Sequence, residues 1–179
     1  MSLKNVAVIG GGSFGTVIAN IVAHNGHHTQ LWMRDSDQVE SLNVTRQNAV
    51  YMPGLELHEK VVATHDLQAA ITGVDTIFVA VPSGSFRAVV RQMKPSLKPG
   101  VILISATKGI EAITFKLMSQ ILAEEVPGAR VVGDCAGVLR NADVGGVELR
   151  VSGRSLDGEE GAPRVGHQID AFLSEPLAQ

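Results

Sequence analysis

The chain has 179 residues, a length that suits one domain or one domain with an appendage, and 45% of them are hydrophobic, which is ample for a core. Its formal net charge of −3 argues against nucleic acid as a main partner, because binding a phosphate backbone requires clustered Lys and Arg side chains. The longest apolar runs, 77–81 and 101–104, are far shorter than the roughly 20 residues that span a bilayer, so no membrane span is expected.

The first predicted strand leads into a glycine-rich turn. The apolar run 6–9 is followed by three spaced glycines, Gly10, Gly12 and Gly15. In a dinucleotide-binding turn the first glycine permits the tight turn, the second lets backbone amides approach a pyrophosphate, and the third lets the helix pack on the strand. Free N–H groups and the positive end of the helix dipole favour an anion there. Because such glycine turns also occur by chance, the next segments must support this interpretation.

The next two elements do support it. Apolar residues at helical spacing across 17–22 predict a helix, and Gly26 is the glycine stop expected just past its end. The run 28–33 predicts a second strand. This strand ends in Arg34 and Asp35, about where the second strand of such a fold presents the residue that reads the ribose. We therefore expect a dinucleotide site.

Two patterns in this region have a structural explanation beside a functional one. His24 and His28 are four residues apart, a spacing of metal ligands on helices, but the helix is expected to end between them and no third ligand is near. We expect no metal site. Asp35 and Asp37 form either a carboxylate pair or, as we expect, the cap of a helix that carries Val39.

Downstream, strands and helices alternate as in a doubly wound parallel sheet. Strands are predicted at 61–63, 76–81, 101–105 and 130–132. Three helices are predicted between them. The first is short, capped within 64–66 and extending through Thr72, with Gly73 as its stop. The second has the apolar residues Phe86, Val89, Val90 and Met93, and the third has the apolar residues Leu117, Met118, Ile121 and Leu122. The expected fold class is therefore α/β, a Rossmann-type doubly wound parallel sheet.

Residues that leave the strands are the functional candidates, because ligands of such sheets bind at the carboxyl ends of the strands. Besides the glycine turn, two exits stand out, 81–83 and 106–109. Lys108 in the second exit is the catalytic candidate, since an ammonium there can polarise a carbonyl or neutralise a phosphate. A solvated loop lysine is the alternative. The basic stretch that includes Arg87 and Arg91 is expected to be a solvated helix face.

Five motifs occur in order and at familiar separations: 10–16, 31–35, Asn48 with 51–54, 79–83 and 106–111. Through about residue 132, the chain resembles the bacterial-type NAD(P)-dependent glycerol-3-phosphate dehydrogenases. The resemblance implies an oxidoreductase of phospholipid metabolism that moves hydride between NAD(P)H and dihydroxyacetone phosphate or glycerol 3-phosphate.

The resemblance also implies residue roles. The counterparts of Ser13 and Phe14 contact the dinucleotide, and the counterpart of Lys108 contacts both cofactor and glycerol phosphate. The counterpart of Arg34 lies near the adenosine ribose, where a guanidinium suits the 2′-phosphate of NADP, whereas Asp35 would favour the 2′-hydroxyl of NAD. Use of both cofactors is therefore plausible. The expected cofactor-binding residues are Gly10, Gly12, Ser13, Phe14, Gly15, Arg34 and Lys108, and the expected catalytic residue is Lys108.

The resemblance ends after Val132. The family continues with a Ser-Gly-Pro segment and a large helical domain carrying a second lysine, and neither is found in 133–179, a glycine-rich stretch with no Lys and with 8 acidic against 4 basic residues. We expect a dinucleotide-binding domain at 1–132, a divergent tail at 133–179, no helical substrate domain, and weak or no activity of this chain alone. A true alternative ending, a reading-frame change and a docking segment remain open for the tail.

Two other functions remain open: a catalytically incomplete nucleotide-binding remnant, and the first domain of another Rossmann dehydrogenase, such as a 6-phosphogluconate or ketopantoate type. The segments 32–35 and 107–111 weigh against the latter. A single cysteine, Cys135, and no visible signal peptide favour the cytoplasm. The expected partner is a small-molecule substrate, dihydroxyacetone phosphate or glycerol 3-phosphate, and a homo-oligomer is compatible with the sequence.

Overall fold

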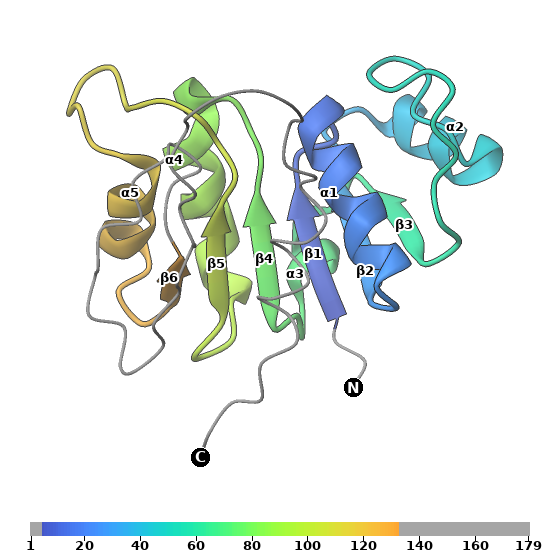
Figure 1. The fold of residues 1–179 in the computed structure, drawn as a ribbon. Coiled ribbons are helices and arrows are strands. Elements are labelled where there is room, and N and C mark those ends of the chain that lie inside the picture. The colour runs from blue at the N-terminus through green and yellow to red at the C-terminus, as the bar shows by residue number, and fades with distance from the viewer. Residues whose placement is uncertain (1–4, 133–179) are drawn as a thin grey trace, which may run out of the picture. The chain divides into compact units, whose positions relative to one another are not determined.

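The computed structural model describes residues 5–132, which form a parallel sheet with helices on both faces (Figure 1). In chain order the elements are β1 (Asn5–Ile9), α1 (Ser13–His24), β2 (His28–Trp32), α2 (Ser36–Thr45), β3 (Val61–Thr64), α3 (Leu67–Ile71), β4 (Thr76–Val79), α4 (Ser83–Met93), the 3₁₀ turn η1 (Lys94–Ser96), β5 (Ile102–Ser105), α5 (Met118–Glu125) and β6 (Arg130–Val132). The predicted tail 133–179, with Cys135 and the boundary at 132, lies outside the described residues.

The six strands are ordered β3-β2-β1-β4-β5-β6, and every neighbouring pair is parallel. The chain winds outward from β1 to β3, returns to the middle at β4, and winds outward in the other direction to β6. The predicted doubly wound sheet is therefore confirmed. The order reverses between β1 and β4, and it is at such a switch point that open α/β sheets bind their ligands.

The apolar patterns seen in the sequence form the core. All residues of β4 are buried, as its unbroken apolar run predicted. The predicted helix face of Phe86, Val89, Val90 and Met93 is buried in one cluster with residues from α3, α5 and the strands. One residue was placed wrongly. Leu117 is 41% exposed, because α5 begins at Met118 and Leu117 precedes it in extended conformation.

Local sequence also sets the helix ends. Asp66 accepts hydrogen bonds from the backbone N–H groups of Gln68 and Ala69, which confirms the cap predicted within 64–66. The predicted strand 76–81 ends earlier, at Val79, because the chain turns there toward α4, which starts just after Pro82. None of the helices within residues 5–132 is both long enough and apolar enough to cross a membrane.

The basic stretch on α4 differs from its prediction. The Arg87 side chain is only 16% exposed and forms ion pairs with Glu111, Glu124 and Glu125. Arg91 also pairs with Glu125, although it is exposed. A solvated face is therefore the wrong description for Arg87. The acidic partners lie 24 to 38 residues away in sequence, so no local pattern could have indicated them.

One of the two histidines considered as metal ligands, His24, contacts another histidine ring. The ring of His24 packs edge-on against the ring of His58, with 4.8 Å between their centroids. Throughout residues 5–132, no group of three or more His, Cys, Asp or Glu side chains is placed to hold a metal ion.

Candidate functional site

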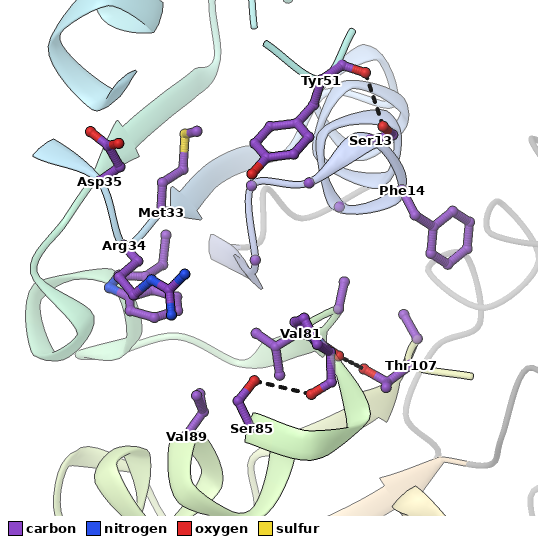
Figure 2. Close-up of a pocket in the computed structure, with 18 of the residues that line it drawn as sticks. Ser13, Phe14, Met33, Arg34, Asp35, Tyr51, Val81, Ser85, Val89 and Thr107 are labelled. Carbon is purple, nitrogen blue, oxygen red and sulfur yellow. Dashed lines mark hydrogen bonds between the residues drawn. The ribbon is translucent and has the colours of Figure 1, made fainter. Parts of the chain in front are cut away.

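A cleft of about 1030 Å³ lies at the carboxyl ends of β1, β2, β4 and β5. Its walls include the segments 10–15, 32–36, 80–83 and 106–108, which lie at the carboxyl ends of these strands, with Trp32 the last residue of β2 (Figure 2). The strand exits singled out in the sequence thus line one cleft. The cleft brings together every site residue predicted from the sequence, namely Gly10, Gly12, Ser13, Phe14, Gly15, Arg34 and Lys108.

The three glycines of the turn are needed for different reasons. Gly10 has φ +122°, and a Cβ there would lie 2.4 Å from the carbonyl oxygen of Ala80. A Cβ on Gly15 would lie 1.8 Å from the carbonyl oxygen of Gly10. Folding therefore requires glycine at both positions, one for the turn and one for the close approach of α1.

Gly12 is different. A Cβ on Gly12 would have no heavy atom of the described residues within 4 Å, and its φ of −71° suits any residue. The fold itself thus gives no reason for glycine at this position. Gly12 lies in the cleft wall at the start of α1, so the open space above it is available to a ligand.

The loop between α2 and β3 braces the turn from outside. Asn48 is 3% exposed, and its Nδ2 donates to the carbonyl oxygen of Gly11 (2.9 Å) and to Oγ1 of Thr16 (2.8 Å). Nearby, Oγ of Ser13 donates to the carbonyl oxygen of Tyr51 (2.9 Å; Figure 2). Asn48 belongs to a motif quoted above, but its bracing role was missed, because its partner Gly11 lies 37 residues away.

Backbone donors also face the cleft. No side chain of the described residues caps the N-terminus of α1 or α4, and both helices begin in the cleft wall. Their first N–H groups have no partner within the helix, and the positive ends of their dipoles favour negative charge. By contrast, α2 and α3 are capped by Asp35 and Asp66. The two open helix ends give the cleft a local preference for anions.

The exit of β2 presents a charged pair with divided roles. Asp35 caps α2: its Oδ1 accepts from the backbone N–H groups of Asp37 (3.0 Å) and Gln38 (3.1 Å), and its Oδ2 accepts from Nε2 of Gln38 (3.0 Å). These bonds, the Gln38 backbone N–H first, lower the pKa of Asp35. The predicted cap is confirmed, with Asp35 as the capping residue. Arg34 is exposed, and its guanidinium has no partner within residues 5–132.

The exit of β5 carries the predicted lysine. Thr107 is 6% exposed, and its Oγ1 donates to the carbonyl oxygens of Val81 (2.7 Å) and Val79 (3.1 Å), which ties the start of this loop to the exit of β4. Lys108, the next residue, is exposed in the cleft wall. Its ammonium has no hydrogen-bond or ion-pair partner among the described residues, so it is available to a ligand.

Comparisons with known proteins point in one direction. The family described as "NAD-dependent glycerol-3-phosphate dehydrogenase N-terminus" matches residues 5–139. Among curated relatives, a glycerol-3-phosphate dehydrogenase [NAD(P)+] of Teredinibacter turnerae is 50% identical over 126 residues, and one of Pseudomonas entomophila is 52% identical over 126 residues. Each alignment covers 70% of this chain and 37% of the relative.

A solved structure agrees with these matches. The crystal structure of glycerol-3-phosphate dehydrogenase from Coxiella burnetii superposes with a TM-score of 0.67 at 31% identity, covering 71% of this chain and 39% of that chain. The chain thus spans well under half the length of the relatives it matches. Within the span that does match, these comparisons favour the glycerol-3-phosphate dehydrogenase type over the ketopantoate and 6-phosphogluconate types left open above.

Proposed function

The chain belongs to the NAD-dependent glycerol-3-phosphate dehydrogenase family, in its N-terminal part, and from this premise we propose that residues 1–132 bind NAD(P) in the cleft. In this role the domain is the cofactor-binding part of an oxidoreductase acting on glycerol 3-phosphate and dihydroxyacetone phosphate. The observation that carries the proposal is Gly12. The fold leaves its Cβ position empty, beside the uncapped start of α1, so the space suits a group that needs to approach the backbone closely.

The residues of the cleft fit such a cofactor along its length. The N–H groups at the start of α1, with Gly10, Gly12 and Gly15 shaping the turn, would hold the pyrophosphate. Ser13 and Phe14 open the helix at the same place, and Phe14 is 42% exposed, which leaves its ring free to cover a ligand. When bound, NAD(P)H supplies the hydride that reduces the ketone of dihydroxyacetone phosphate.

Arg34 would distinguish the two cofactors. Its unpaired guanidinium can grip a 2′-phosphate through two parallel hydrogen bonds. Asp35 already accepts three hydrogen bonds as the cap of α2, so it has less capacity to accept one from the 2′-hydroxyl of NAD. Both cofactors are therefore expected to bind, with NADP preferred.

Lys108 is proposed as the catalytic residue. Its ammonium is exposed in the cleft wall at the exit of β5, and it can donate a hydrogen bond to an anionic oxygen of the cofactor or of the glycerol phosphate. The same donor can polarise the carbonyl of dihydroxyacetone phosphate. The rigid tie from Thr107 to Val81 supports a fixed position for the backbone that carries it.

A titration of the purified chain with NADPH, followed by the fluorescence of the reduced nicotinamide, tests the proposal. Saturable binding that weakens in Lys108→Met is expected. Oxidation of NADPH by dihydroxyacetone phosphate, measured in the same sample, separates the two open functions: turnover indicates complete catalytic machinery, and binding without turnover indicates the nucleotide-binding part alone. Absence of binding at millimolar NADPH contradicts the proposal.

A further inference from the structure

Lys108 lies in the loop 106–117, which connects β5 to α5. Thr107 ties the start of this loop to Val81, and the half-buried Arg87 of α4 holds it at a second point, Glu111. We propose that Arg87 and Glu111 are positioning residues that fix this loop and thereby hold Lys108 in the cleft. The inference rests on the proposed function of Lys108 and adds to it the residues through which the fold places that side chain.

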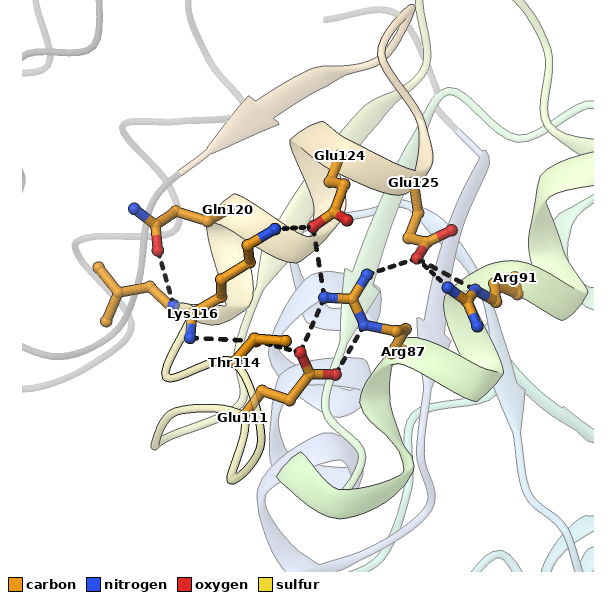
Figure 3. Close-up of polar contacts among 9 residues, drawn as sticks. Arg87, Arg91, Glu111, Thr114, Lys116, Gln120, Glu124 and Glu125 are labelled. Carbon is orange, nitrogen blue, oxygen red and sulfur yellow. Dashed lines mark hydrogen bonds and ion pairs between the residues drawn. The ribbon is translucent and has the colours of Figure 1, made fainter.

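The contact between the two residues has the geometry of a strong ion pair. Nε of Arg87 donates to Oε1 of Glu111 (2.6 Å), and Nη2 of Arg87 donates to Oε2 (2.8 Å), so the planar guanidinium meets the carboxylate through two parallel bonds (Figure 3). The side chains are 16% and 17% exposed. A half-desolvated bidentate pair of this kind is more specific in geometry than the exposed single contacts of most surface ion pairs.

Glu111 also organises the loop around itself. Its backbone N–H donates to the carbonyl oxygen of Lys116 (2.9 Å), and its own carbonyl accepts from the N–H of Phe115 (2.8 Å). Oγ1 of Thr114 donates to Oε2 of its carboxylate. Residues 111–116 therefore form a closed turn that begins at Glu111, the residue that Arg87 holds.

Lys108 is thus flanked by two anchors. On one side, Thr107 is bound to the carbonyl oxygen of Val81 at the exit of β4. On the other side, Glu111 is bound to Arg87 on α4. Their partners, Val81 and Arg87, belong to the exit of β4 and to α4, which join at Ser83, the first residue of α4 and part of the cleft wall. Fixing the loop on both sides of Lys108 fixes where its side chain enters the cleft.

Charge gives the pair a second effect. Glu111 is ionised at neutral pH, and hydrogen bonds from Arg87, then from Thr114, stabilise its charged form and lower its pKa to about 2. Without Arg87, a bare carboxylate three residues from Lys108 would attract the ammonium and repel phosphate groups in the cleft. Pairing with Arg87 removes that competition and leaves the ammonium for an anionic ligand.

The chain offers a matched control. Arg91 pairs with Glu125 (2.9 Å) and so also links α4 to α5, but it forms no hydrogen bond or ion pair with the loop 106–117. If the cluster merely joined the two helices, Arg91→Gln and Glu111→Gln would have similar effects. If Glu111 positions Lys108, only Glu111→Gln affects the cleft.

The experiment measures NADPH affinity and amide hydrogen exchange in the full chain for Glu111→Gln, Arg91→Gln, Lys108→Met and the double variant Glu111→Gln/Lys108→Met. Glu111→Gln is expected to weaken NADPH binding roughly 3- to 30-fold and to speed exchange across 108–117, whereas Arg91→Gln does neither. In the Lys108→Met background, Glu111→Gln is expected to cause no further loss of affinity, since the side chain that it positions is gone.

Three other outcomes would contradict either this inference or the proposed function. Equal losses from Glu111→Gln with and without Lys108 show that Glu111 does not act through the lysine, which overturns this inference while the proposed function stands. If Glu111→Gln leaves amide exchange across 108–117 unchanged, Glu111 does not fix the loop, and this inference is overturned. A wild-type chain that binds no NADPH overturns the proposed function, and this inference with it.

Discussion

Replacing the glycines of the turn one at a time separates what the fold requires from what a ligand requires. In Gly15→Ala the new Cβ would lie 1.8 Å from the carbonyl oxygen of Gly10, and in Gly10→Ala 2.4 Å from that of Ala80. Both obstacles are backbone atoms that cannot rotate away, so α1 or the turn must move. Such overpacking costs roughly 1–3 kcal/mol or more, which lowers the melting temperature of a domain this size by about 3–15 °C.

Gly12→Ala should behave differently. The Cβ enters open space at an ordinary φ, so the gain from a less flexible unfolded chain (about 0.4–1 kcal/mol) roughly offsets the poorer helix cap. We expect a melting temperature close to that of the wild type. NADPH affinity should fall at least tenfold, or about 1.4 kcal/mol, because the methyl group occupies the space through which a pyrophosphate reaches the amides.

Thermal unfolding followed by circular dichroism and NADPH titration of the same samples test both halves of this reasoning. Gly26→Ala is the control: Gly26 has φ +93° just beyond the far end of α1, so alanine is strained there without entering the cleft. It should lower the melting temperature and leave affinity intact. An unchanged affinity in Gly12→Ala, or a loss of stability in Gly12→Ala as large as that in Gly15→Ala, would refute the reasoning.

Three further predictions concern the groups around the turn and the loop. Arg34→Ala should weaken NADPH by roughly 1.5–3 kcal/mol and NADH much less, and equal losses in parallel titrations would show that Arg34 does not read the 2′-phosphate. Asn48→Ala should cost about 1–3 kcal/mol of stability and also weaken NADPH binding, because it removes the shorter of the two hydrogen bonds to the carbonyl oxygen of Gly11 and the one to Thr16. Asn43→Ala, which removes the hydrogen bonds with Ala63, should cost stability alone, and urea unfolding with NADPH titration would compare the two variants. The pKa of Glu111 is about 2 in the folded chain against an ordinary 4.5, so its contribution to stability is present above pH 4.5 and is lost as the pH falls toward 2. The Glu111→Gln variant lacks this contribution, so urea unfolding should show that it loses less stability than the wild type between pH 5 and pH 2.

Much of the fold could be predicted because its signals are local. Apolar runs set the strands, Asp35 and Asp66 cap the helices that follow them, and a strand order with parallel crossovers is the usual solution for this alternation. Periodicity failed where a helix begins: Leu117 has the spacing of an apolar face, but it precedes the first turn of α5 and so stays exposed. A spacing rule cannot tell the first residue of a helix from the one before it.

The site was predictable only in part, for a related reason. Gly10, Gly15 and Lys108 follow strands directly, so the topology brings them to one edge once the sheet is known. The contacts that brace the neighbouring backbone join residues far apart in sequence: Asn48 and Gly11 are separated by 37 residues, and Glu111 and Arg87 by 24. Nothing in the local sequence of either partner indicates the other, because side-chain hydrogen bonds between distant loops depend on the finished packing.

The segment that follows β4 explains how the two halves of the sheet, β1–β3 and β4–β6, can share one cleft. The carbonyl oxygen of Ala80 limits how closely the glycine turn of β1 can approach, and the carbonyl oxygen of Val81 accepts the hydroxyl of Thr107 beside Lys108. The glycine turn, with the donors proposed for the pyrophosphate, and Thr107, next to the proposed catalytic Lys108, are therefore both positioned by neighbouring peptide groups of one short segment, 80–81. Main-chain atoms of a segment that follows a fully buried strand shift little, so the sheet sets the spacing between the backbone of the glycine turn and that of Thr107, and the proposed anchor at Glu111 adds to the placement of Lys108. A cofactor that must present one end to an anion site and the other to a lysine gains a site built before it arrives, which reduces the ordering that binding would otherwise require.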